Sequence, residues 1–343
     1  MTRRDLILSS LAFAPNDGAY EQAERLIEQR VRSGEVAAAV LHFRSGGKTF
    51  ERAFGKASTP EAVFLIASIT KPMTATAVML MADRGKLRLT DAVTKYIPEF
   101  HGEGRESVQI RHLLTHTSGL PDMLPENEAL RRRHASLSAF VEGACRTPLL
   151  FKPGTKQRYQ SMGILLAAEI VSRLSGQPFP EFLRAEIFAP LGMGKTSLGL
   201  GGRSIPSTMQ SQVSEVNDWD WNSSYWRNLA SPWGGAHSTV GDISHFLRSF
   251  VQPKQVVLRR ETAASMIVNQ NANVDRPWGY GWMVGSSGFG KGCSESSFGH
   301  SGSTGTLCWH DPQRDRTFVL LNTKPAEVSS KTLLRPVSEL LSQ

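Results

Sequence analysis

Hydrophobic positions recur along this chain with two different periods. In residues 19–34 and 163–176 they return every three or four positions, which predicts two helices. Residues 305–310 and 316–323 are instead short apolar runs rich in branched and aromatic side chains, with a turn-forming segment between them. These two runs predict adjacent strands.

Strand-like segments gather near the two ends of the chain. Residues 35–55 predict two strands that meet at Gly46 and Gly47, and residues 280–284 predict another strand. From residue 68 to about residue 190 the pattern is almost wholly helical. This order predicts an α/β (α+β) fold, in which both ends of the chain build a sheet domain and an all-helical domain is inserted between them.

The predicted boundaries follow this pattern. Residues 16–66 and 236–343 form the expected sheet domain, and residues 67–235 form the helical domain. The helical domain ends in an irregular loop that is rich in aromatic residues, namely Trp219, Trp221, Tyr225, Trp226 and Trp233. Such a loop either lines an apolar substrate site or packs on itself, so both interpretations stay open. Trp226 and Trp233 are the candidate substrate contacts.

Composition and charge exclude several classes of protein. The chain has 343 residues, 40% of them hydrophobic, and a formal net charge of +8 that is mostly scattered. Its one dense basic run, Arg131–Arg133 with His134, lacks interleaved aromatics and predicts a solvated helix face, so no nucleic-acid partner is expected. No apolar stretch is long enough to span a bilayer, so no integral membrane segment is expected.

The first 15 residues have the outline of an export signal. Arg3 and Arg4 precede a short apolar run that ends in Ala12-Phe13-Ala14, which is typical of twin-arginine signals. Pro15 would hinder cleavage at that point. We therefore expect a periplasmic or secreted protein, with a cytoplasmic one as the alternative if the signal does not function.

The cysteines and paired histidines do not predict a metal site. Cys145, Cys293 and Cys308 form no metal-binding spacing, although a bridge between the last two stays open. His112 and His116 share one helix face but lack the glutamate of a metalloprotease helix, which favours structural roles. No cofactor is expected.

A nucleophile and a base are suggested by "SITKP". On a helix, Ser68 and Lys71 share one face, and Pro72 places the start of that helix close to Ser68. The spacing alone is weak evidence, because Ser45 and Lys48 repeat it within the predicted hairpin.

Two further segments carry candidate site residues. "PGTKQRYQSMG" places Tyr159 on a loop just before a helix, and "FGHSGSTGT" places His300 and Gly302 at a strand edge. Alone, a tyrosine or a histidine in such a place is most often a packing residue.

In this order the three segments resemble the serine β-lactamase and penicillin-binding protein superfamily, most closely its class C β-lactamase-like hydrolases. That group includes D-Ala-D-Ala carboxypeptidases and family VIII carboxylesterases, and it is marked by S-x-x-K, Y-x-N and K-T-G or H-x-G. Further similar segments are "LLTHTSGLPD", "FAPLGMGKTS", "GGAHSTVGDISHF" and "GYGW". The resemblance implies the β-lactamase/transpeptidase-like fold, an antiparallel sheet flanked by helices with an inserted helical domain.

The resemblance also implies roles for the candidate residues. Ser68 would attack the carbonyl and form an acyl-enzyme, with Lys71 and Tyr159 as the bases. Burial would lower the pKa of Lys71, and the ammonium would help Tyr159 to lose its proton. The backbone N–H groups of Ser68 and of Ser303, the residue after Gly302, would hold the oxyanion, and His300 would orient the substrate.

Two departures from the family pattern point to the substrate. Ser161 stands where the second motif usually has asparagine. Its shorter side chain cannot replace both the amide donor and the amide acceptor of asparagine. His300 gives a weaker fixed positive charge than the usual lysine. Both departures favour a carboxylesterase acting on short-chain or aromatic esters, with weak or no β-lactamase activity.

Other functions remain open alternatives. The first is a D-Ala-D-Ala carboxypeptidase, penicillin-binding protein or class C-type β-lactamase, and the second is a catalytically silent relative that binds the cell wall. In the enzymatic alternatives the partner is a small-molecule ester or amide. The sequence does not indicate an oligomeric state.

Overall fold

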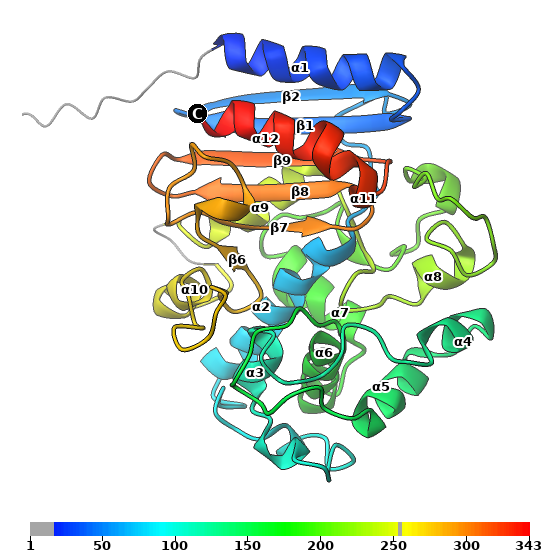
Figure 1. The fold of residues 1–343 in the computed structure, drawn as a ribbon, viewed down its shortest axis with the longest axis vertical. Coiled ribbons are helices and arrows are strands. Elements are labelled where there is room, and N and C mark those ends of the chain that lie inside the picture. Colours follow the sequence, from blue (N-terminus) through cyan, green and yellow to red (C-terminus); the bar gives the residue numbers. More distant parts are fainter. Residues whose placement is uncertain (1–16, 253–255) are drawn as a thin grey trace, which may run out of the picture.

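A computed structural model describes residues 17–252 and 256–343 (Figure 1). Among these residues, six strands form an antiparallel sheet in the order β2-β1-β9-β8-β7-β6. The strands are β1 (Ala38–Ser45), β2 (Lys48–Gly55), β6 (Met283–Val284), β7 (Phe298–Gly302), β8 (Thr306–Asp311) and β9 (Arg316–Asn322). Strands from the two ends of the chain therefore share one sheet, as the sequence predicts.

Local turn chemistry sets the register of the first hairpin. Ser45 pairs with Lys48, so the connection consists of Gly46 and Gly47, whose φ angles are 56° and 81°. Two consecutive positive φ angles define the turn that matches the twist of a hairpin, and glycine adopts them without steric cost. The predicted hairpin is confirmed.

Helices cover both faces of the sheet. Alternate β1 residues such as Leu41 pack in a core cluster with α1 (Asp17–Arg32) and α12 (Arg335–Ser342). Intervening residues such as Val40 face α9 (Val240–Ser249) in the main core. The period-two alternation of a strand thus places successive side chains in two different layers.

The other helices lie mainly below the sheet in Figure 1. They are α2 (Thr70–Asp83), α3 (Ile110–Leu114), α4 (Asn127–Arg132), α5 (Leu137–Arg146), α6 (Met162–Ser175), α7 (Phe179–Leu183), α8 (Ser224–Asn228) and α10 (Arg260–Met266). The short α11 (Ala326–Ser329) instead lies beside the sheet, next to α12. Three short strands form a second sheet in the order β3 (Phe64–Leu65), β5 (Ala236–Ser238) and β4 (Ser197–Leu198). In the chain, β3 directly precedes the Ser68 turn, and β5 directly precedes α9.

One core joins the sheet to the helices. Val319 of β9, Val78 of α2 and Leu165 of α6 all belong to the same cluster of buried residues. Because α2 is buried from Thr70 to Met81, it has no polar face and packs on neighbours all around. The division into two domains at residues 67 and 235 therefore stays a prediction.

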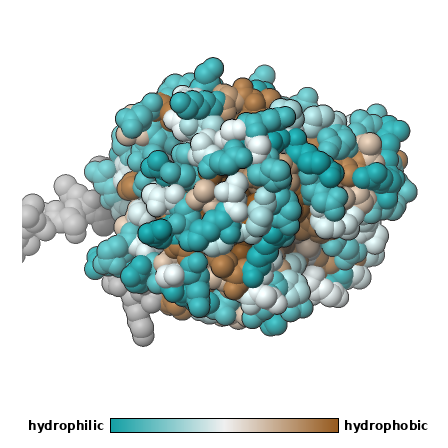
Figure 2. Space-filling view, turned by 90° about the horizontal axis from the view of Figure 1, so that it is seen from below, coloured by the Kyte–Doolittle hydropathy of each residue, from teal (hydrophilic) through white to brown (hydrophobic). Residues whose placement is uncertain are grey.

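Several sequence expectations concern the surface. The expected export signal lies outside the described residues. Within the described part of the chain, no helix has both the length and the apolar character needed to cross a membrane. The helical end of the molecule, seen from below in Figure 2, is mostly hydrophilic with smaller hydrophobic patches.

Two local expectations need correction. Arg131 is not simply solvated, because its guanidinium lies 5.0 Å from the ring centre of Trp219 and 4.1 Å from that of Trp226. The bridge left open between Cys293 and Cys308 is absent, because both are free and buried, as is Cys145.

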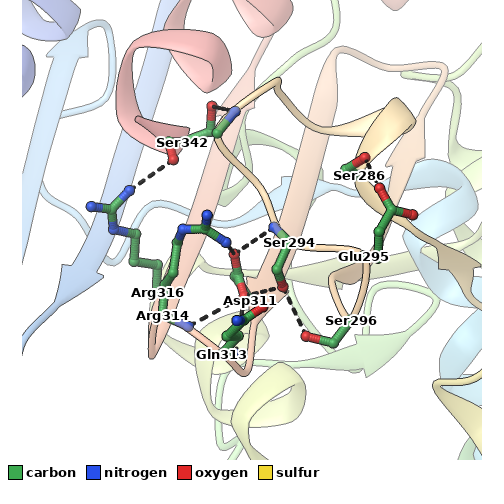
Figure 3. A network of polar contacts seen from close by, with 10 residues as sticks. Ser286, Ser294, Glu295, Ser296, Asp311, Gln313, Arg314, Arg316 and Ser342 are labelled. Carbon is green, nitrogen blue, oxygen red and sulfur yellow. Dashed lines mark hydrogen bonds and ion pairs between the residues drawn. The ribbon is translucent and has the colours of Figure 1, made fainter. Parts of the chain in front are cut away.

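A buried carboxylate fastens the loop before β7 to the sheet (Figure 3). Asp311 is 1% exposed and accepts hydrogen bonds from the Ser294 backbone N–H at 2.8 Å and the Ser294 hydroxyl at 2.6 Å. It also accepts one from Arg314 Nη1 at 3.2 Å. Burial alone would raise the pKa of Asp311, but these donors outweigh it and lower the pKa.

We expect Asp311→Asn to reduce the free energy of unfolding by about 1–3 kcal/mol at pH 7. The substitution replaces one acceptor oxygen with an NH₂ group, which would face the N–H and O–H donors around it. Because the folded pKa is lowered, the carboxylate stabilises above the unfolded value of about 3.9 and loses this contribution as the pH falls. Urea unfolding from pH 7 down to pH 3 should therefore show the two proteins converging at acid pH. Asp315→Asn, at an exposed ion pair with Arg44, is the control and should cost less than about 1 kcal/mol.

Candidate active site

Ser68 lies in a strained turn at the start of α2. It belongs to a 3₁₀ turn, Ala67–Ile69, and α2 begins directly afterwards at Thr70, so Pro72 falls in the first helical turn as predicted. Ala67 has a φ of 45°, in the left-handed region that a residue with a side chain rarely adopts. The surrounding structure must therefore hold this turn in place.

Two threonines hold the chain before Ser68. The hydroxyl of Thr304 donates to the Leu65 carbonyl at 2.7 Å, and that of Thr306 donates to the Ile66 carbonyl at 3.0 Å. Both threonines are buried. Sequence reasoning missed them, because their partners lie more than 200 positions away in the chain.

The free edge of β7 lies against the Ser68 turn. The strand expected over residues 280–284 is only Met283–Val284, which pairs with Gly299 and Phe298. Among the described residues, His300–Gly302 therefore has no strand partner on that side. At Gly302, an added Cβ would collide with the Ile66 carbonyl oxygen and the Thr306 hydroxyl. This glycine permits the close approach of the two segments.

Lys71 is placed as a base for Ser68. Its Nζ lies 3.0 Å from Ser68 Oγ and donates to the Trp233 carbonyl at 2.9 Å. The lysine is 1% exposed, and burial lowers its pKa to about 7, although the negative charge of Asp122 partly opposes that shift. The lowered pKa expected for Lys71 is therefore confirmed.

Tyr159 joins the same cluster from the loop before α6. Lys71 Nζ lies 4.8 Å from the centre of its ring, and Ser68 is close enough to affect its pKa. The expectation that its proton leaves more readily is wrong: burial raises its pKa, and Asp122 raises it further, against the opposing effect of Ser68. Tyr159 is thus a phenol at neutral pH.

His300 is close to this cluster but uncharged. Its Nδ1 lies 2.7 Å from the Ser301 carbonyl oxygen, which can only accept, so Nδ1 carries the proton. Nε2 is then an acceptor, buried and without a partner in the described structure. Burial lowers the pKa of His300 to about 3, and the charge of Lys71 lowers it further, so the weak positive charge expected here is absent at neutral pH.

His116 packs against the site, which is compatible with the structural role expected for it. Its ring centre lies 4.6 Å from that of Tyr159 and 4.8 Å from that of Trp278. Its Nδ1 accepts from the Gln160 backbone N–H at 3.2 Å, and burial holds its pKa well below the usual value. The similar segment "LLTHTSGLPD" was the available signal for it. His112, by contrast, caps α3.

Ser161 is bound to a carboxylate that sequence reasoning also missed. Its hydroxyl donates to Asp122 Oδ1 at 2.6 Å, and its backbone N–H donates to the Asp122 carbonyl at 3.3 Å. Ser161 is 1% exposed, whereas Asp122 is exposed. The position where the family has asparagine therefore presents an anchored negative charge.

The two predicted oxyanion donors are free. No hydrogen bond within residues 17–252 and 256–343 uses the backbone N–H of Ser68 or Ser303. Ser303 directly follows β7 and is exposed, and its carbonyl accepts from the Ala326 N–H at 2.9 Å, which fixes the peptide chain there.

The rings of Trp226 and Trp233 do not line the site, contrary to expectation. They are 5% and 2% exposed and pack on each other in the main core, with ring centres 6.4 Å apart. Trp233 instead contributes its carbonyl to Lys71. A pocket of about 920 Å³ adjoins the site and is lined by Asp122, Leu150, Phe151, Thr155, Lys156, Gln157, Arg158, Tyr159, Asn273, Val274, Asp275 and Arg276.

Comparison with known proteins identifies the family of this chain. A family model described as Beta-lactamase matches residues 23–340. The chain belongs to the Beta-lactamase family. This family is part of the serine β-lactamase and penicillin-binding protein superfamily, so the resemblance seen in the sequence is confirmed.

Named relatives in this family are distant in sequence. "Protein flp" of Staphylococcus aureus (strain MW2) is 25% identical over 333 residues, which cover 89% of this chain but only 61% of that protein. A protein of Escherichia coli (strain K12) with the provisional name D-alanyl-D-alanine carboxypeptidase is 26% identical over 356 residues, covering 89% of this chain and 82% of that protein.

A solved structure shows the same fold. EstCE1, described as a hydrolase with promiscuous acyltransferase activity, matches with a TM-score of 0.78 at 19% identity, covering 95% of this chain and 99% of EstCE1. The predicted β-lactamase/transpeptidase-like fold, an antiparallel sheet with helices, is therefore confirmed.

We expect Gly302→Ala to reduce the hydrolysis of a p-nitrophenyl ester at least tenfold, because the new methyl group must displace the Ile66–Ala67 backbone that positions Ser68. Overpacking should also cost about 1–3 kcal/mol in the free energy of unfolding. Gly194→Ala is the matched control, since its Cβ would meet nothing within 4 Å. Equal activity in the two variants would contradict the close approach described here.

Proposed function

We propose that this member of the Beta-lactamase family is a serine hydrolase that forms an acyl-enzyme on Ser68 and acts as a carboxylesterase on short-chain or aromatic esters. One observation carries the proposal. The amine of Lys71, with its pKa lowered to about 7, lies 3.0 Å from Ser68 Oγ. A serine hydroxyl needs such a base to become an effective nucleophile.

The first half of the reaction follows from this geometry. Neutral Lys71 accepts the Ser68 proton as Oγ attacks the carbonyl carbon, and the oxyanion is held by the N–H groups of Ser68 and Ser303. The tetrahedral intermediate then collapses and expels the alcohol, which takes a proton from Tyr159 or Lys71. Tyr159 keeps its proton at neutral pH, so it can donate that proton to the leaving alcohol. Lys71, which holds the Ser68 proton, then reprotonates Tyr159.

The second half reverses these roles. Water attacks the acyl carbon and transfers a proton to Lys71, and Ser68 is released when it regains its proton. His300 is neutral and presents Nε2 as a buried acceptor, which suits it to orienting a donor group of the substrate or water.

The charges at the site favour an ester over a substrate with a free carboxylate. Lactam and D-Ala-D-Ala substrates carry such a carboxylate, and a fixed cation would be needed to bind it. His300 is uncharged at neutral pH, and Ser161 holds the carboxylate of Asp122 nearby. The carboxypeptidase alternative is supported by the provisional name of the E. coli relative.

We expect kcat/KM for a neutral ester to rise with pH through about 7 and then to level off, because only neutral Lys71 can accept the Ser68 proton. Lys71→Ala should lower kcat about 10³-fold. Lys48→Ala is the matched control, because Lys48 stands three residues after Ser45 in the β1–β2 hairpin and repeats the same spacing. A flat pH profile between 5.5 and 8.5 in wild type would refute this role for Lys71.

Intact mass after brief exposure to p-nitrophenyl butyrate or a penicillin separates the two enzymatic functions. We expect fast ester turnover, lost in Ser68→Ala, and slow or no penicilloyl adduct. A stable penicilloyl adduct with little ester turnover would instead identify a penicillin-binding protein. Failure of the folded wild type to react with a fluorophosphonate serine probe would identify a silent binding relative.

A further inference from the structure

We propose that Asp122 recognises a protonated amine close to the scissile carbonyl, so that the preferred substrates are amine-bearing esters or amides. This inference rests on the proposed acylation of Ser68. It concerns the substrate class, which that reaction alone leaves open.

Asp122 is built as a fixed anionic contact. Ser161, which is 1% exposed and directly precedes α6, donates its hydroxyl to Asp122 Oδ1 at 2.6 Å. The bond from Ser161 goes to Oδ1, and no residue in the described parts of the chain forms a hydrogen bond or ion pair with Oδ2. A carboxylate with one oxygen anchored and the other free, on the wall of the pocket beside Tyr159, can accept from a ligand.

The electric field of Asp122 reaches the reacting groups. Its charge raises the pKa of both Lys71 and Tyr159, which places it close enough to act on each. Among the described residues, no lysine or arginine other than Lys71 contributes to the pKa shifts of Lys71, Tyr159, His116 or His300. A cation bound at the free oxygen of Asp122 would meet attraction from this carboxylate.

Other charged side chains line the same pocket. Lys156, Arg158 and Arg276 are exposed, as is Asp275. None of these four contributes to the pKa shift of Lys71 or Tyr159, whereas Asp122, although also exposed, contributes to both. The three basic side chains attract anions to the pocket rim. Asp275 is an acid of the same pocket, so it serves as the control for Asp122.

Amine binding would also assist the chemistry. Because Asp122 raises the pKa of Lys71, a bound ammonium that cancels this charge increases the neutral fraction of Lys71. The substrate would thereby promote its own attack by Ser68. A neutral ester of the same shape gains neither the contact nor this effect.

Two matched pairs of substrates test the proposal at pH 6.5, where an ester α-amine is protonated. The first pair, D- or L-alanine benzyl ester against benzyl propionate, places the amine on the acyl side. The second pair, 2-(dimethylamino)ethyl propionate against 3-methylbutyl propionate, places a protonated amine on the alcohol side. We expect kcat/KM to favour the charged member of at least one pair tenfold or more, as a charge-assisted contact of about 1.5–3 kcal/mol implies.

The variants assign the preference to one side chain. Asp122→Asn keeps the shape and should reduce the charged-to-neutral ratio at least tenfold, whereas Asp275→Asn should keep the wild-type ratio. Ser161→Ala should lower the ratio partly, because Asp122 loses its anchor. Thermal unfolding of each variant shows whether it is folded, and the ratio within one variant cancels any general loss of activity.

The outcomes separate this inference from the proposed function. If neutral esters are hydrolysed through Ser68 but the charged members gain nothing, or if Asp122→Asn leaves the ratio unchanged, the role of Asp122 is wrong and the esterase stands. An equal loss of ratio in Asp275→Asn also overturns the assignment to Asp122. If folded wild type hydrolyses none of these esters, the proposed esterase itself fails.

Discussion

The rest of this structure depends on one lysine buried without a carboxylate partner among the described residues. An ammonium in that place would be costly, so the pKa of Lys71 falls to about 7 and the amine is neutral for much of the time. A neutral amine still needs polar partners, and it has two, Ser68 Oγ and the Trp233 carbonyl. The positions of α2, the Ser68 turn and the chain at Trp233 are therefore tied to one another.

The scaffold around Lys71 meets this requirement with small and hydroxyl-bearing residues. Thr304 and Thr306 hold the strained turn from the β7–β8 connection, and Gly302 lets that connection approach. Thr70 adds a further link, since its hydroxyl donates to the Ala67 carbonyl at 2.6 Å and accepts from the Ala236 N–H at 3.0 Å. The nucleophile is thus positioned by contacts from two distant parts of the chain, residues 302–306 and Ala236.

Features encoded within a few neighbouring residues were predictable from the sequence. The Gly46-Gly47 turn, the helix that follows Ser68 and the strands around residue 311 depend on local spacing and turn chemistry. The three motifs could be combined because their order matches a known family, although their roles stay proposals. Trp226 and Trp233 were misjudged because aromatic residues in a loop serve a core and a binding site equally well.

Features that depend on distant pairs were not predictable. The Asp122–Ser161 contact spans 39 positions and the Lys71–Trp233 contact spans 162, so no local pattern indicates them. The pKa directions of Tyr159 and His300 likewise follow from burial, which only the folded chain defines. The sequence showed which chemical groups are present, whereas the environment that sets their charge came from the fold.

The single core that joins β9, α2 and α6 has a consequence for how this protein loses its structure. Because the same buried cluster supports the helices and one face of the sheet, both lose apolar contacts there when either opens. Unfolding should then proceed as one cooperative transition, without a populated state in which the sheet persists and the helices are released. The turn that carries Ser68 sits inside this cooperative unit, so the competence to form an acyl-enzyme and the global fold should be lost together.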